Sequence, residues 1–169
     1  MAKSKKSSPR GKSAKSSAKA PNAIALLKAD HREVEEWFEQ FEKARSETKK
    51  KDLATRICKA LTVHATIEEE IFYPAFLEAT GEEDLHHEAE VEHAGAKSLI
   101  AQIEASGPED EYFDAKVTVL SEMIKHHVKE EEQSGGMFAE AKASDMDLAV
   151  LGERLAERKR ELMGQAGGR

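Results

Sequence analysis

Apolar residues recur every three or four positions along most of the chain, which is the spacing of one face of an α-helix. Four such stripes can be traced, and their members are Ile24, Leu27, His31, Val34, Phe38 and Phe41; Ile57, Leu61, His64, Glu68, Ile71 and Ala75; Ala89, His93, Ala96, Ile100 and Ile103; and Phe113, Val117, Leu120, Ile124, His127 and Glu131. No segment sustains the period of two that a half-buried strand requires. The pattern predicts an all-α protein.

Four helices with short connections are typical of an up-down-up-down four-helix bundle, which we assign to residues 22–140. Asn22 is suited to cap the first helix. Residues 141–169 are expected to form a short C-terminal fifth helix and tail, with Ser144 as its cap and an end near Leu162. This helix is expected to pack across the bundle or against a second chain through its regularly spaced leucines, Leu148, Leu151 and Leu155.

The charge of the 169-residue chain is unevenly divided. The whole chain has a formal net charge of −7, yet residues 1–20 hold seven Lys and Arg and no acid, so the remainder carries −14. Residues 1–21 also lack any apolar period, which predicts a disordered basic tail. The tail could make a weak, non-specific contact with nucleic acid or another polyanion, whereas the acidic body argues against a nucleic-acid-binding domain.

Cysteine usage and hydropathy restrict the setting. The single cysteine, Cys58, cannot form an internal disulfide, so we expect a cytoplasmic protein in which this thiol is a small buried residue. No apolar run approaches the ~20 residues that span a bilayer, so we expect no membrane partner.

Each of the four apolar stripes is interrupted by a histidine, and two stripes carry a glutamate one turn later. Burying such groups unpaired would cost several kcal/mol. Residues equidistant from the turn of an antiparallel hairpin lie at one height, and three turns here bring the six side chains within about two helical turns of one level. These side chains are His31, His64, Glu68, His93, His127 and Glu131.

Four imidazoles and two carboxylates in an apolar core favour a metal site of iron, manganese or zinc, and the lack of thiolate ligands argues against a Cys-rich zinc site or an Fe–S cluster. Two histidines per metal and two carboxylates able to bridge have the stoichiometry of a dinuclear centre. A ferritin-like site would need Glu-x-x-His on two helices, but both copies here, ending at His86 and His93, lie on the third helix. A zincin motif, a Walker loop, GxGxxG and GxSxG are all absent from the sequence.

The joint spacing of four segments resembles the hemerythrin family, specifically the bacterial hemerythrin-like HHE cation-binding domains, over about residues 22–140. The segments are Ala29-Asp30-His31, His64 to Glu69 with Phe72-Tyr73-Pro74, Glu92-His93, and His127 to Glu132. The resemblance implies that His31, His64, His93 and His127 are terminal ligands and that Glu68 and Glu131 bridge two iron ions (Fe2+/Fe3+) with an oxo, hydroxo or water bridge. It also implies binding of O2 or a related small oxidant, for oxygen, redox or iron sensing or handling.

One departure from that pattern keeps alternatives open. Oxygen-carrying hemerythrins have a fifth histidine four residues from the one that matches His93, but Ala89 and Lys97 stand at those positions here. An open coordination position favours sensing, peroxide chemistry or iron handling over simple O2 carriage. The alternatives are a di-iron oxidoreductase that consumes peroxide, and an iron-responsive interaction module whose tail contacts nucleic acid. The oligomeric state stays open.

The remaining histidines and aromatic residues receive structural roles. His86 and His87 are expected on a solvated face, and His126, about 100° around the helix from His127, is expected outside the core stripe. Tyr73 could donate a hydrogen bond near the metals, although packing is the preferred role. Core packing is also expected for Trp37, Phe72 and Phe76.

Overall fold

The computed structural model describes residues 19–165, and within that range every regular element is a helix. The elements are α1 (Ala23–Lys43), α2 (Glu47–Ile67), the π-helical turn η1 (Glu68–Phe72), α3 (Tyr73–Thr80), α4 (Glu83–Glu104), α5 (Phe113–Glu132), α6 (Met137–Ala143) and α7 (Leu148–Gln165). The all-α prediction is therefore confirmed. The predicted disordered tail, residues 1–21, lies almost wholly outside the described residues.

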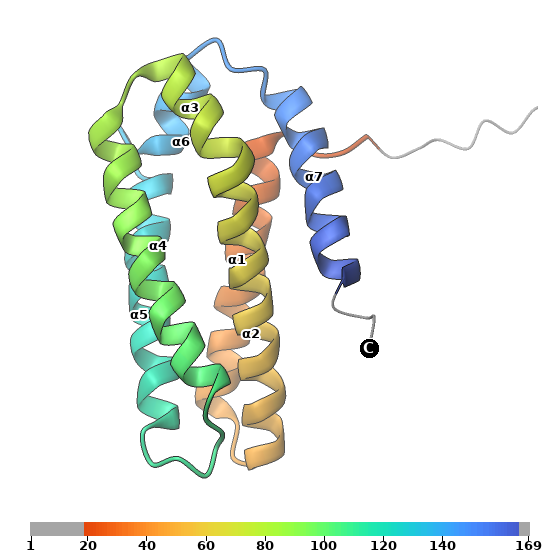
Figure 1. Ribbon diagram of the computed structural model, residues 1–169, viewed down its shortest axis with the longest axis vertical. Helices are drawn as coiled ribbons and strands as arrows, with labels where there is room; N and C mark the ends of the chain where they lie inside the picture. The colour runs from red at the N-terminus through yellow and green to blue at the C-terminus, as the bar shows by residue number, and fades with distance from the viewer. Residues whose placement is uncertain (1–18, 166–169) are drawn as a thin grey trace, which may run out of the picture.

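The long helices form an antiparallel bundle, in which α2 continues through η1 into α3 (Figure 1). Around the bundle α1 neighbours α2, α2 neighbours α4, α4 neighbours α5, and α5 neighbours α1. The short helix α6 lies near α3 at the end of the bundle away from the α1–α2 and α4–α5 connections, and α7 runs along α1 and α2 (Figure 1). None of the described helices is long and apolar enough to cross a membrane.

Several helices begin or end at the residues that the sequence predicted. Asn22 accepts a hydrogen bond from the backbone N–H of Ala25 at 2.9 Å, which confirms it as the N-cap of α1. Gly81, with φ of 70°, ends α3 in the left-handed region that favours glycine. The prediction for Ser144 was wrong. Its hydroxyl donates to the backbone oxygen of Ala141 at the end of α6, and it is Asp147 that caps α7.

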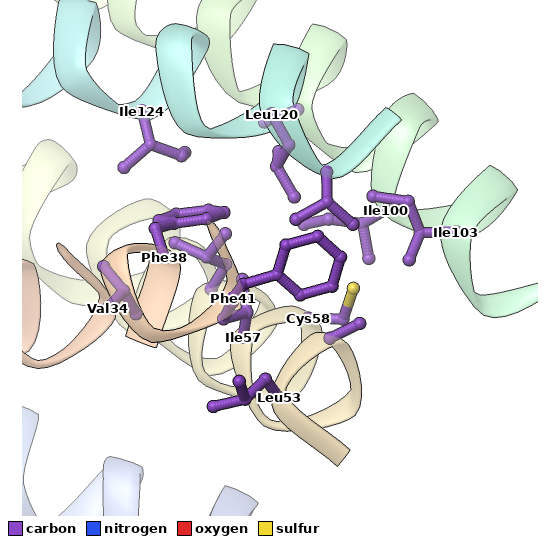
Figure 2. Close-up of a cluster of buried hydrophobic side chains, with 14 of the residues drawn as sticks. Val34, Phe38, Phe41, Leu53, Ile57, Cys58, Ile100, Ile103, Leu120 and Ile124 are labelled. Carbon is purple, nitrogen blue, oxygen red and sulfur yellow. The ribbon is translucent and has the colours of Figure 1, made fainter. Parts of the chain in front are cut away.

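The core consists of two hydrophobic clusters separated by a polar layer. The first fills the half of the bundle nearer the α1–α2 turn, and Figure 2 shows its members converging from α1, α2, α4 and α5. The second, around Phe72, Phe76 and Phe138, lies at the opposite end beneath α3, α6 and α7. Histidine and glutamate residues of the bundle helices are buried between the two.

Helix α7 packs on the bundle of its own chain, as one of the two sequence alternatives proposed. Leu151 and Leu155 are buried in the second cluster. Gly152 permits the approach, because a Cβ there would lie 2.1 Å from the backbone oxygen of Pro21. The fifth helix is thereby fixed beside the start of α1.

Candidate metal centre

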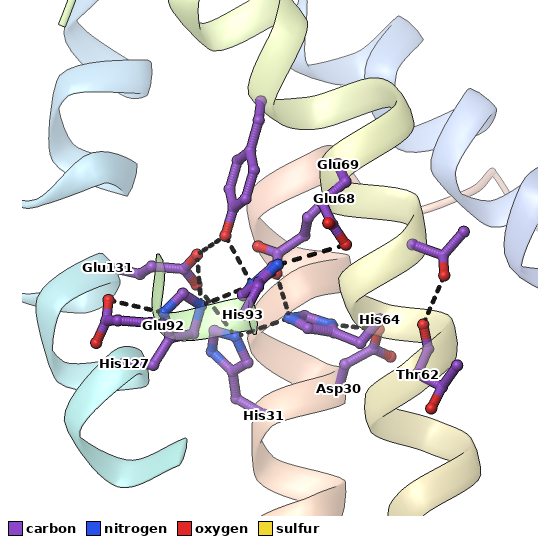
Figure 3. Close-up of polar contacts among 12 residues, drawn as sticks. Asp30, His31, Thr62, His64, Glu68, Glu69, Glu92, His93, His127 and Glu131 are labelled. Atoms are coloured by element: carbon purple, nitrogen blue, oxygen red, sulfur yellow. Dashed lines mark hydrogen bonds and ion pairs between the residues drawn. The ribbon is translucent and has the colours of Figure 1, made fainter. Parts of the chain in front are cut away.

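The six side chains singled out in the sequence meet in one layer of the bundle. They come from α1 (His31), α2 (His64), η1 (Glu68), α4 (His93) and α5 (His127 and Glu131). Their exposed fractions lie between 0% and 7%. Figure 3 shows the four imidazoles and two carboxylates pointing toward one another from these helices.

The ligand atoms fall into two groups of three, each compact enough to surround a metal ion. One group is His31, His64 and Glu131; the other is Glu68, His93 and His127. Both carboxylates reach histidines of both groups. Glu68 Oε1 lies 3.0 Å from Nε2 of His64 and 3.3 Å from Nε2 of His93. Glu131 lies 3.1 Å from Nε2 of His127 and 3.3 Å from Nε2 of His31. Each carboxylate therefore lies between the two ligand groups.

The donor set fits a pair of cations. Within the described part of the chain, both oxygens of Glu68 and Oε2 of Glu131 are buried without a hydrogen-bond donor, although Glu68 Oε1 and Glu131 Oε2 lie within ion-pair distance of imidazole nitrogens. The Nε2 atoms also face each other, at 3.2 Å between His31 and His64 and at 3.3 Å between His93 and His127. Unpaired buried carboxylates and opposed imidazole nitrogens are costly alone and are satisfied by metal ions. Nitrogen and oxygen donors without sulfur suit iron, manganese or zinc.

The histidines and carboxylates of the layer shift one another's pKa values. Burial alone would lower the pKa of His64, but Glu68 and Asp30 outweigh it and raise the pKa to about 10. In the same way burial lowers and Glu131 raises the pKa of His127, to about 11. Burial opposes the charged form of Glu68 too, yet His64 and His93 hold its pKa well below the ordinary value. The layer therefore favours positive charge between its carboxylates.

The outward Nδ1 atoms of the histidines face a second ring of carboxylates. Nδ1 of His31 pairs with Glu132 at 3.0 Å, Nδ1 of His64 with Asp30 at 3.0 Å, and Nδ1 of His127 with Glu92 at 3.1 Å. Nδ1 of His93 lies 3.6 Å from Glu69, which is too long for a hydrogen bond. A proton held on Nδ1 leaves Nε2 free to bind a metal, and partners of this kind orient metal-binding histidines.

Tyr73 also belongs to the layer, and the preference for a packing role missed this. Its hydroxyl donates to Glu131 Oε1 at 2.9 Å and lies 3.0 Å from Nε2 of His93. The cause is η1, in which the N–H of Tyr73 bonds to the carbonyl of Glu68, five residues back. This wider turn places Tyr73 on the inner face in place of Ile71. The available signal was Pro74, which has no N–H and disrupts a regular helix.

The other histidines lie outside the six-residue cluster. His126 has an exposed side chain, 65%, beside Glu92, as the helical phase predicted. His87 is exposed, also as predicted. His86 departs from its predicted solvated position, because it packs edge-on against the ring of Tyr73, 6.0 Å between centroids. Among the described residues no fifth histidine reaches the cluster, and the nearest additional polar group is the Tyr73 hydroxyl.

Comparison with known proteins agrees with this geometry. The family model described as the hemerythrin HHE cation binding domain matches residues 22–134. A curated relative named DNA nickase, from Nostoc sp., is 31% identical over 113 residues, which is 67% of this chain; the chain spans about a third (32%) of that relative's length. A crystal structure of a hemerythrin HHE cation binding domain-containing protein from Mycobacterium kansasii shares the fold with a TM-score of 0.71 at 24% identity, covering 86% of this chain and 90% of that one. The chain therefore belongs to the hemerythrin HHE cation-binding domain family.

Proposed function

We propose that the protein holds a non-haem di-iron centre and binds O2 or a related small oxidant there. His31, His64, His93 and His127 would be the terminal ligands, and Glu68 and Glu131 would bridge. The observation that carries the proposal is that each buried carboxylate lies within 3.3 Å of a histidine from both ligand groups. Two irons held in this way would supply redox chemistry toward O2 or peroxide.

The surrounding residues bury the candidate ligands and hold them in place. The second hydrophobic cluster packs on one side of the layer, and the first cluster lies on the other side, next to a small cavity. Phe138 stacks on the ring of His31, with 5.8 Å between centroids and an interplanar angle of 9°. Outer carboxylates hold three of the four imidazoles by hydrogen bonds at Nδ1. A ligand set held by packing and by outer partners binds metal with little reorganisation.

The decisive measurement is the metal content of the full chain, with its optical spectrum under air and under argon. We expect about two irons per chain, in line with the two ligand groups. A His64→Ala, Glu68→Ala double variant should lose most of the metal, whereas a His87→Ala, Glu88→Ala variant, altered on the exposed face of α4, should retain it. Fewer than about one metal per chain, unchanged by the first variant, would refute the di-iron centre.

A peroxide-consuming oxidoreductase is the second candidate, and Tyr73 favours it. Burial, together with Glu68 and Glu131, raises the pKa of Tyr73 well above its ordinary value, so its hydroxyl keeps a proton beside two candidate ligands. A hydroxyl that stays protonated beside a metal centre can donate a hydrogen bond to the oxygen atoms of an oxidant. Peroxide turnover that survives gel filtration and disappears in His127→Ala would favour the enzyme. A stoichiometric spectrum that forms in air and reverses under argon would favour the carrier or sensor.

The basic segment at residues 1–20 supports a third candidate, an iron-responsive module that contacts nucleic acid. Its seven cations and absence of acids suit a polyanion, and the relative from Nostoc sp. is named a DNA nickase. DNA binding that weakens steeply with salt and is lost on deletion of residues 1–20 would support this role. Equal binding by the truncated chain would reject it.

A further inference from the structure

A cavity of about 160 Å³ adjoins the histidine layer on the side of the first hydrophobic cluster. Its polar wall is formed by the four candidate ligand histidines. Its other walls are mainly apolar and come from α2, α4 and α5, and the apolar lining residues are Leu61, Ala65, Ala96, Ile100, Met123, Ile124 and Val128. The cavity is several times larger than the roughly 10–15 Å³ that holds one water molecule on the same measure.

The burial pattern agrees with a real gap in the packing. Most buried residues of the bundle are 0–6% exposed, and the five that reach 7–9% are Leu61, His64, Ala65, Ala96 and Ile124. All five line the cavity. The solvent accessibility of the buried residues is therefore highest at one place in the core, where side chains from α2, α4 and α5 leave a gap.

Three further polar residues line the cavity, Glu92, Lys97 and His126, and Glu92 is held 3.1 Å from Nδ1 of His127. Lys97 is 47% exposed and pairs with Glu69 at 2.6 Å. His126 is 65% exposed and lies 3.4 Å from Glu92. Because each of these groups already has an ion-pair partner, none is left to pair with a charged occupant of the cavity. A charged occupant would lose its water against apolar walls at a cost of several kcal/mol.

We infer that this cavity is a binding site for uncharged, mainly apolar molecules of about the size of benzene, with at most a small polar end turned toward the histidines. An apolar protein cavity of about 150 Å³ stays dry and binds benzene, which sets the scale. One extension rests on the proposed function. The oxidants that reach the metal centre would then include those with an apolar substituent, of the organic hydroperoxide class.

The test is thermal unfolding of the full-length chain, as isolated and after chelation, with and without benzene. At free benzene about ten times its Kd, selective binding to the folded state should raise Tm by about 3–6 °C. Ala96→Leu extends a side chain into the cavity and should abolish most of the rise. Leu61→Phe fills it from α2 and serves as a second variant if Ala96→Leu fails to fold. Ala101→Leu makes the same change on the exposed face of α4 and should leave the rise intact.

The outcomes separate this inference from the metal centre. No rise in Tm in the wild-type chain, or an equal rise in Ala96→Leu and Leu61→Phe, would overturn the binding site, even in a chain that holds two irons. Benzene binding would support the cavity whether or not the chain holds iron, whereas a lack of iron in the chain as isolated would count against the di-iron proposal alone.

Discussion

The carboxylate of Asp30 links the fifth helix to a candidate metal ligand, and its removal should weaken metal binding. Asp30 Oδ2 lies 3.0 Å from Nδ1 of His64, and its Oδ1 accepts from Lys159 of α7 at 2.5 Å. Its side chain is 11% exposed. Burial raises the pKa of Asp30, but His64 and Lys159 outweigh that effect and lower it. The carboxylate is therefore ionised at neutral pH, where it orients His64 and makes its imidazole more basic.

Asp30→Asn keeps the shape and an acceptor oxygen but removes the charge. Loss of an outer partner of a metal-binding histidine typically weakens metal binding about 10–100-fold. This corresponds to about 1.4–2.7 kcal/mol. We expect the effect within that range, since Asp30 is the hydrogen-bond partner of Nδ1 of His64 and also the partner of Lys159.

The assay is competition for Fe2+ under argon between the protein and a coloured chelator. Glu39→Gln is the matched control, because Glu39 is exposed on the same helix and has no ion pair within the described part of the chain. Lys159→Met should weaken affinity less, and should add little in the Asp30→Asn background if Lys159 acts through Asp30. Equal Fe2+ affinities for Asp30→Asn and Glu39→Gln would refute the reasoning.

Three further predictions follow from burial, packing and charge. Burial raises the pKa of Cys58 to about 12, so a thiol reagent at pH 8 should label it only after unfolding; rapid labelling of the native protein would contradict this. Because the pKa values of His64 and His127 are about 10 and 11, a metal ion must displace one proton in each ligand group, and the apparent affinity for each metal should rise by about tenfold per pH unit between pH 6 and 9. A flat profile in chelator competition would oppose it. Gly152→Ala should lower the free energy of unfolding by about 1–3 kcal/mol in denaturant titration, whereas Gly164→Ala, with open space around it, should not.

The position of the six-residue layer could be predicted because it depends on local information. Helical phase decides which residues face inward, and turn positions decide which of them share a height. His127 and His126 illustrate the first point, since one position separates a buried side chain from an exposed one. Gly81, which ends α3 where the sequence placed a turn, illustrates the second.

For Tyr73 the sequence favoured a packing role over a hydrogen bond to the site, because the helical period changes at the site itself. A constant period of 3.6 residues places Ile71 and Ala75 inward after Glu68, but the π-turn advances the inner face by one residue. Phe72, Tyr73 and Phe76 are consequently buried. The contact of Lys159 with Asp30 could not be predicted from the sequence for another reason. It joins residues 129 positions apart and depends on how α7 packs on the bundle.

The contacts of α6 and α7 show that the candidate site extends past the region that the family model matches. That match ends at residue 134, before both helices. Yet Phe138 of α6 stacks on His31, and Lys159 of α7 holds the carboxylate that faces His64. Arg158 adds a contact from α7 to Glu70 of η1, 2.8 Å from its Nε. Since His31 and His64 share one ligand group, the C-terminal helices act on one half of the proposed dinuclear centre. The two ligand groups are therefore inequivalent in their outer surroundings, even though each consists of two histidines and one glutamate.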